Sequence, residues 1–234
     1  MKLVKHLARL GYGSRKEVQR HIKRGAATDT EGNPLGNADL IPHEDIRFYG
    51  EELDPPQFLT IILNKPTGYI CSTDEVPDTV YELLPYRFLN RNPVLSSVGR
   101  LDKDTSGMLI MTDDGKLLHK LIHPKQKVGK VYDVILDRPM KGDEGELFAS
   151  GEMLLKDDAK PLKPAQLEVL GEKHARLTLQ EGRYHQVRRM FAATGNHVLE
   201  LKRIAMGGLA LPEDIEEGEW RAITEEELNL VLQG

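Results

Sequence analysis

The sequence predicts an α+β protein in which a small N-terminal domain precedes a larger domain, built on a mixed, largely antiparallel sheet flanked by helices. Three observations lead to this fold class. Apolar residues recur at helical spacing twice within the first 24 residues. Residues 51–57 (EELDPPQ) then contain paired prolines, which exclude helix and stiffen a linker. From residue 58 onward, strand-like runs alternate with helical stripes. We therefore expect one domain with its linker at 1–57 and a second domain at 58–234.

The N-terminal domain is expected to begin with two short helices. The first is indicated by leucines at helical spacing, Leu3, Leu7 and Leu10. Ser14 is a good N-cap for a second helix over 15–24, and short strand-like pieces follow at 26–28 and 46–49. A unit of this size has too little core to be robust by itself.

The larger domain is expected to hold eight strands, which are Phe58–Leu63, Tyr69–Thr73, Val94–Val98, Met108–Thr112, Val131–Leu136, Gln166–Leu170, Ala175–Gln180 and His197–Ile204. Apolar and polar residues alternate cleanly in 175–180, which predicts a sheet with one covered face. Apolar stripes at 117–122 and 187–191 indicate helices between strands. The last helix is expected to carry a capping box, Thr224 to Glu227, before the apolar residues Leu228, Val231 and Leu232.

The composition fits a soluble, cytoplasmic protein. Charged residues make up 29% of the chain and hydrophobic residues 39%. No apolar run approaches the ~18 residues of a transmembrane helix, and no apolar block follows the N-terminal charges as it would in a signal peptide. Cys71 is the single cysteine, which excludes an internal disulfide. We expect no association with a membrane.

Charge is distributed unevenly along the chain. The net charge of −5 argues mildly against a nucleic-acid partner, but residues 1–24 hold eight basic side chains and one acidic one. Residues 213–227 hold eight acidic side chains and one basic one. A local basic face is what contacts with phosphates require, whatever the total charge. The alternative is a solvated helix surface without a partner.

The segment Gly99–Gly107 (GRLDKDTSG) concentrates polar chemistry between two strand-like runs. It holds an arginine, two carboxylates and two hydroxyls within nine residues. Loops between strands commonly carry reactive groups. Asp, Ser, Thr and Gly are also ordinary turn residues, so the segment alone leaves a functional loop and a plain turn as equal readings.

This segment resembles the catalytic-aspartate motif of the RsuA-type pseudouridine synthases, which act on small-subunit rRNA. Three more segments are similar to that family in the same order: Leu63–Tyr69 (LNKPTGY), Gly129–Tyr132 (GKVY) and Glu181–Met190 (EGRYHQVRRM). The resemblance runs from the first residue to about residue 227. It implies the pseudouridine synthase fold for the larger domain and an S4-like (αL) RNA-binding module for the N-terminal domain.

The resemblance implies that Asp102 is the catalytic carboxylate. Pseudouridine formation breaks the bond from ribose C1′ to uracil N1 and makes one to C5. An ionised carboxylate near the sugar can act there as nucleophile or base. From the residues alone Asp102 and Asp104 are nearly equal candidates, although capping a turn suits Asp104. Arg188 matches the family's arginine, and we expect it to pair with Asp102 and keep it charged. The enzymatic interpretation depends on that proximity and on a cavity beside Asp102 that admits a nucleotide.

The resemblance also implies the rest of the substrate pocket. Tyr132 is expected to be catalytic, since its ring suits stacking against a flipped uracil and its hydroxyl can assist proton movement at C5. Leu201 is expected to pack on the base, and Arg100 and Lys65 complete the pocket, with Lys65 bracing the active-site loop or contacting a phosphate. A half-buried strand tyrosine and a core leucine are the plain alternatives. The detached uracil must recombine before water arrives, so the pocket must be dry.

Expected RNA contacts lie in both domains. In the S4-like module they are Ser14, Arg15, Lys16, Arg20, Lys23 and Arg24. In the larger domain Arg183 and Arg189 are expected to reach RNA, with a structural role as the alternative for each. We expect the target uridine to be extruded from its fold, because a stacked or paired base hides C1′.

No cofactor is expected, because the reaction involves no redox change and no phosphate energy, and the chain has neither GxGxxG nor a P-loop. No metal is expected either: His119 and His123 lie four residues apart, but the glutamate of HExxH is missing between them. They read as surface histidines.

The expected function is a site-specific pseudouridine synthase for 16S rRNA, acting on the rRNA or on an assembling small ribosomal subunit as a monomer. The S4-like module and the lack of a long basic tail after the last helix favour a small-subunit target. The alternatives are a synthase acting on large-subunit (23S) rRNA and a non-catalytic rRNA-binding or assembly factor with the same fold. A nucleoside hydrolase is disfavoured, because no second carboxylate stands in a comparable motif.

Overall fold

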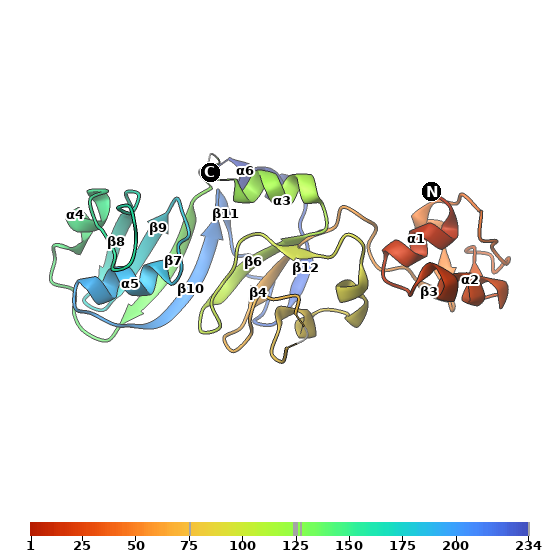
Figure 1. The fold of residues 1–234 in the computed structure, drawn as a ribbon, viewed down its shortest axis with the longest axis horizontal. Helices are drawn as coiled ribbons and strands as arrows, with labels where there is room; N and C mark the ends of the chain where they lie inside the picture. The colour runs from red at the N-terminus through yellow and green to blue at the C-terminus, as the bar shows by residue number, and fades with distance from the viewer. Residues whose placement is uncertain (75, 124–125, 127, 234) are drawn as a thin grey trace.

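The computed structural model describes residues 1–74, 76–123, 126 and 128–233, and three regions follow one another along its longest axis (Figure 1). The N-terminal region lies at one end. Two halves of one large sheet make up the centre and the other end. Within the described ranges no helix is long and apolar enough to cross a membrane.

The N-terminal region consists of two helices and a three-stranded antiparallel sheet: α1 (Leu3–Arg9), α2 (Arg15–Lys23), β1 (Ala27–Thr28), β2 (Arg47–Phe48) and β3 (Glu51–Glu52), with a short 3-10 helix η1 (His43–Asp45). Ser14 caps α2 as predicted: its hydroxyl accepts from the Glu17 N–H at 3.3 Å, and the Glu17 carboxylate accepts from the Ser14 N–H at 2.8 Å. The region has its own apolar core, which includes Leu3, Leu7 and Val18. Because 51–52 pairs as β3, the connecting segment is shorter than the predicted linker.

A buried ion pair fastens the connecting segment to the rest of the chain. Arg91 and Asp113 form this pair at 2.8 Å, with side chains 0% and 1% exposed. Arg91 also donates to the carbonyls of Pro55 and Pro56, at 2.9 and 2.8 Å. The prolines therefore act as an anchored strap between the N-terminal region and the large sheet.

The large sheet has the strand order β12-β4-β6-β10-β7-β9-β8, with β5 on β6 and β11 on β10. The strand bounds are β4 (Thr60–Lys65), β5 (Ser96–Ser97), β6 (Ser106–Thr112), β7 (Lys130–Leu136), β8 (Gln166–Gly171), β9 (His174–Leu179), β10 (Val198–Met206), β11 (Leu209–Ala210) and β12 (Trp220–Ala222). Among the described strands only β6 and β10 pair in parallel, and only over two residue pairs. The predicted α+β class with a mixed, largely antiparallel sheet is confirmed.

Both faces of β4 and β6 are covered, which explains their unbroken apolar runs. One face meets α3 (Gly115–Ile122) and α6 (Glu225–Leu232), and Ile62 and Ile110 lie in that core. The other face belongs to the larger core, which extends under α4 (Glu144–Ala149) and α5 (Gln186–Ala193) on the far half of the sheet. Loops with two 3-10 helices, η2 (Val80–Leu83) and η3 (Tyr86–Asn90), complete that second core.

Two predicted strands are wrong in extent. Residues 69–73 form no strand, because Ile70 bonds locally with Asp78 and Val80 at 2.7 and 3.0 Å instead of joining the sheet. Residues 94–98 shrink to the two residues of β5. The short elements α4, β11 and β12 were not predicted, since segments this brief carry little periodicity.

Candidate active site

The loop that carries Asp102 lies between β5 and β6, at the parallel junction of the two half-sheets. Gly107, just inside β6, has φ +100°, and a Cβ there would stand 2.3 Å from the Arg203 carbonyl oxygen. Only glycine permits this close approach, which brings β6 against β10. The loop before Gly107 is thereby held beside Leu201 on β10.

Several contacts fix the backbone of this loop. The Lys65 ammonium donates to the Thr105 carbonyl at 2.8 Å, and the Gly68 N–H donates to the Lys103 carbonyl at 2.7 Å. A turn closes within the loop itself, where the Thr105 N–H donates to the Asp102 carbonyl at 3.1 Å. Arg188 on α5 donates to the Asp104 carbonyl at 2.9 Å. Asp102 is thus presented on a backbone tied down on three sides.

A cavity of about 280 Å³ opens beside Asp102. Its lining includes Tyr132 from β7 and Leu201 from β10, which are 8% and 5% exposed. The remaining lining comes from the loop around Asp102, from β9 and from the start of α5: Gly99, Arg100, Leu101, Thr105, Leu179, Gly182, Arg183, Tyr184, His185, Gln186 and Val187. One carboxylate therefore faces a small space with an aromatic ring and an aliphatic side chain in its wall, as a stacked pyrimidine would require.

The expected pairing of Arg188 with Asp102 is wrong. The guanidinium of Arg188 forms its ion pair with Asp104, at 3.0 Å, and donates to the Val198 carbonyl at 2.9 Å. The reason is the turn at 102–105, which sends successive carboxylates in different directions. Arg188 therefore braces the loop through Asp104. Of the two conditions set for the enzymatic interpretation, the pairing with Arg188 fails, and a cavity beside Asp102 is present.

His185, and not Arg188, is the basic side chain that lies beside the carboxylate of Asp102. Its Nε2 stands 3.5 Å from Oδ1 of Asp102, whose side chain is 32% exposed rather than buried. His185 adopts a left-handed backbone at φ +47° immediately before α5, and its ring stacks on Tyr184 at 3.9 Å. Left-handed backbone at a non-glycine residue is strained and gathers at functional sites. The polar RYH run within the matched segment was the available signal for His185.

The predictions that Arg100 and Lys65 belong to the substrate pocket have different outcomes. Arg100 lines the cavity and its side chain is exposed. Lys65 does not line it: the residue is 0% exposed, and its ammonium is used by the carbonyls of Pro66 and Thr105, both at 2.8 Å. The prediction that Lys65 lies in the substrate pocket is therefore wrong. Its ammonium supports the loop that carries Asp102.

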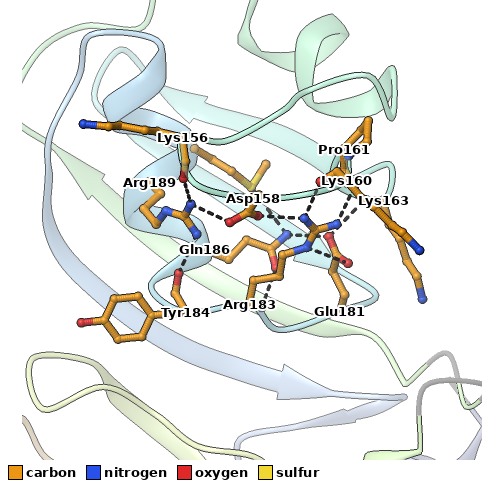
Figure 2. Close-up of polar contacts among 11 residues, drawn as sticks. Lys156, Asp158, Lys160, Pro161, Lys163, Glu181, Arg183, Tyr184, Gln186 and Arg189 are labelled. Atoms are coloured by element: carbon orange, nitrogen blue, oxygen red, sulfur yellow. Dashed lines mark hydrogen bonds and ion pairs between the residues drawn. The ribbon is translucent and has the colours of Figure 1, made fainter.

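Arg183 and Arg189 are both engaged by Asp158 (Figure 2). Each guanidinium lies 2.7 Å from a different oxygen of that carboxylate. Their hydrogen bonds, first from Arg189 and then from Arg183, hold the pKa of Asp158 below its usual value. Arg189 also donates to the carbonyl of Lys156, and Arg183 to that of Lys160. The structural alternative holds for both arginines, and an RNA contact from either stays a prediction.

The expected RNA-binding residues of the N-terminal region all lie on α2 or at its two ends. Ser14, Arg15, Lys16, Arg20, Lys23 and Arg24 are exposed. Among the described side chains none of the five cations here takes part in an ion pair. They form an open basic surface, whose role as an RNA contact stays a prediction.

No group of three or more His, Cys, Asp or Glu side chains is placed to hold a metal ion within the parts of the chain that the structure describes. The Cys71 thiol lies 3.5 Å from the backbone N–H and carbonyl of Leu101, and burial raises its pKa. It supports the loop rather than offering a thiolate.

Comparisons with known proteins agree with this geometry. The family model described as RNA pseudouridylate synthase matches residues 59–193. The chain is 43% identical to the ribosomal small subunit pseudouridine synthase A of Escherichia coli K12, over 99% of this chain and all of that protein. It is 39% identical to a Bacillus subtilis protein described as an uncharacterized RNA pseudouridine synthase, over 99% and 98% of the two chains. A crystal structure described as a pseudouridylate synthase superposes with a TM-score of 0.70 at 37% identity, covering 99% of each chain. The chain therefore belongs to the RNA pseudouridylate synthase family.

Proposed function

We propose that this protein isomerises a uridine of 16S rRNA to pseudouridine, with Asp102 as the carboxylate that acts on the sugar or the base. The observation that carries the proposal is the position of Asp102 at a cavity walled by Tyr132 and Leu201. Relatives named for the small ribosomal subunit support the choice of RNA. The protein would work in the cytoplasm as a monomer, on 16S rRNA or on the assembling subunit.

The chemistry needs a carboxylate, a grip on the free base and the exclusion of water. Asp102 attacks as a nucleophile or removes a proton while the bond from C1′ to N1 breaks. The buried walls at Tyr132 and Leu201 hold the uracil during its rotation, so that C5 can meet C1′ before water does. The proton lost from C5 and the one gained at N1 leave the overall composition unchanged, in keeping with an isomerisation.

The N-terminal region would add affinity and orientation through phosphates rather than by reading bases. We propose residues 1–57 as an S4-like module, with the exposed cations of α2 as its contact surface. Neutralising Arg20, Lys23 and Arg24 together should reduce the slope of log affinity against log salt by about 2–3, at roughly 0.7–0.9 per lost contact. If the variant keeps the wild-type slope, these cations of α2 do not contact RNA phosphates.

Asp102→Asn tests the catalytic assignment. On a 16S rRNA transcript, pseudouridine formation should fall at least about a thousandfold, as expected for loss of a nucleophile or essential base, while the affinity for RNA stays near the wild-type value. Asp104→Asn is the matched control, because Asp104 is the neighbouring carboxylate, 63% exposed and paired with Arg188. It should keep most of the activity.

The alternatives give different results in the same assay. Wild-type protein that binds 16S rRNA but never forms pseudouridine in any rRNA would establish a binding or assembly factor. If pseudouridine forms in 23S rRNA only, the substrate is large-subunit rRNA. Release of free uracil would indicate a hydrolase.

A further inference from the structure

A second cavity, of about 390 Å³, adjoins the one at Asp102. The two share four lining residues, Gly99, Arg100, Tyr132 and Gly182. Apolar side chains from α3 and β10, among them Leu121 and Met206, form part of its floor. Tyr132 therefore stands as a partition with one cavity on each side.

Four cations line this second cavity: Arg100, Lys130, Lys163 and Arg203. Glu181 is the carboxylate in the lining, and it is already used by Gln186 at 3.1 Å and Arg183 at 3.4 Å. None of the four cations has an ion-pair partner among the residues that the structure describes. The cavity thus carries a surplus of positive charge.

Arg203 gives the strongest indication that this cavity binds an anion. The residue is 1% exposed, and its Nε donates to the Met108 carbonyl at 2.8 Å, but its Nη2 has no hydrogen-bond partner among the described residues. A buried guanidinium without a counter-charge is costly unless an anion completes it. Within the described part of the chain, the ammonium of Lys130 donates to the Val128 carbonyl alone, at 3.2 Å, and this residue lines the same cavity.

Burial is the main influence on the ammonium of Lys130, and the charges of its cationic neighbours add to it. Burial, together with the charges of Arg203 and Lys163, lowers the pKa of Lys130 to about 8. Residues two positions apart on a strand lie on the same face of the sheet. Lys130 therefore shares a face with Tyr132 on β7, and Arg203 shares a face with Leu201 on β10. This face of the sheet carries Tyr132 and Leu201 at the first cavity and Lys130 and Arg203 at the second.

We propose that the second cavity binds the backbone phosphate that joins the target uridine to its neighbour in the RNA chain. The proposal rests on the proposed function and deepens it, by assigning the phosphate of a flanking nucleotide to Lys130, Lys163 and Arg203. A uridine held at Asp102 carries a phosphodiester on either side, and the cations line the cavity that shares Tyr132 with the one at Asp102. The buried charge of Arg203 in the cavity wall would add to the attraction for an anion there.

Neutralising the two lysines tests this assignment. Lys163→Gln changes an exposed side chain and Lys130→Gln a partly buried one, so that at least the first variant leaves folding intact. For a 16S rRNA transcript, each should raise the Kd several-fold and lower the slope of log affinity against log salt by about 0.7–0.9. At saturating RNA the turnover rate should stay within a few-fold of the wild type.

Lys202→Gln is the matched control. It changes an exposed lysine on β10, next to Arg203 but on the opposite face by strand alternation, and should leave affinity and slope unchanged. If Lys130→Gln and Lys163→Gln both keep the wild-type slope, or if Lys202→Gln lowers it equally, the site is overturned.

Inorganic phosphate, added at constant ionic strength, separates an RNA phosphate from a free one. Weak competition with RNA in the millimolar range supports the backbone assignment. Micromolar binding of inorganic phosphate by the wild type, lost in Lys130→Gln, would instead make this a site for free phosphate and overturn the proposal. Failure of the proposed function is a separate result, namely wild-type protein that makes no pseudouridine.

Discussion

Replacing Arg91 by methionine should be among the most damaging single changes to this chain. The guanidinium bonds to Asp113 through Nε and Nη2, at 3.0 and 2.8 Å, and to the carbonyls of Pro55 and Pro56. Arg91→Met would leave a buried carboxylate, whose Oδ1 already has no hydrogen-bond partner in the described part of the chain, and would remove the guanidinium from two carbonyls. Removing one member of a buried pair costs about 3–5 kcal/mol.

Urea unfolding of the wild type and the variants measures that cost. For a chain of this size the loss corresponds to a fall in Tm on the order of 10 °C. Arg87→Met is the control: Arg87 pairs with Asp54 at 2.6 Å, but its side chain is 45% exposed, so the expected loss is below about 1 kcal/mol. The double change Arg91→Met with Asp113→Leu should cost less than the sum of the two single changes, because no stranded charge remains.

Two results would refute this reasoning: a loss below about 1 kcal/mol for Arg91→Met, or strict additivity in the double variant. The change also bears on function, because the strap at Pro55 and Pro56 holds the basic N-terminal region in place. A loosened strap should weaken binding to 16S rRNA more than it slows conversion of bound RNA.

Three further predictions concern the junction and the C-terminal helix. Leu201→Ala should cost about 2–5 kcal/mol and admit water, so that turnover in the pseudouridine assay falls more than RNA affinity; an unchanged rate would exclude Leu201 from the wall. Gly107→Ala should lower stability by at least about 2 kcal/mol in urea unfolding, because its Cβ meets the Arg203 carbonyl; a neutral effect would contradict that contact. Glu227 is hydrogen-bonded to Arg221, which lowers its pKa from 4.5 to about 2. Its contribution is complete above pH 4.5 and is lost as the pH falls toward 2, so Glu227→Gln should flatten that part of a stability-against-pH curve; an unaltered curve would disprove the pairing.

The long elements of the fold were predictable because their cause is local. Alternating or unbroken apolar runs in β6, β7 and β9 appear directly in the sequence, as does the capping box that begins α6. The run at 69–73 shares the composition of a strand, but its backbone is satisfied by Asp78 and Val80, a choice that only the tertiary structure decides.

The site was predictable in its residue types more than in its pairings. Asp102, Tyr132 and Leu201 come from three segments far apart in sequence and line one cavity. The partner of Arg188 was not predictable, because it depends on the turn that separates Asp102 from Asp104.

The cations of the second cavity could have been found from the sequence. Lys130 and Arg203 lie two positions from Tyr132 and Leu201 along strands, and residues two apart share a face. What the alternation could not supply is the burial of Arg203 and the absence of an ion pair for either residue among the described side chains, because both depend on which elements surround the cavity.

The two-rung parallel ladder between β6 and β10 acts as a seam through the middle of the enzyme. The carboxylate of Asp102, proposed here as catalytic, lies on one side of this seam, and the side chains of Tyr132 and Leu201 that line the same cavity lie on the other. The two half-sheets share both of their large apolar cores across this seam. The distance between the carboxylate and a bound sugar is therefore set by side-chain packing along the seam, where the described strands contribute only two rungs of backbone hydrogen bonds.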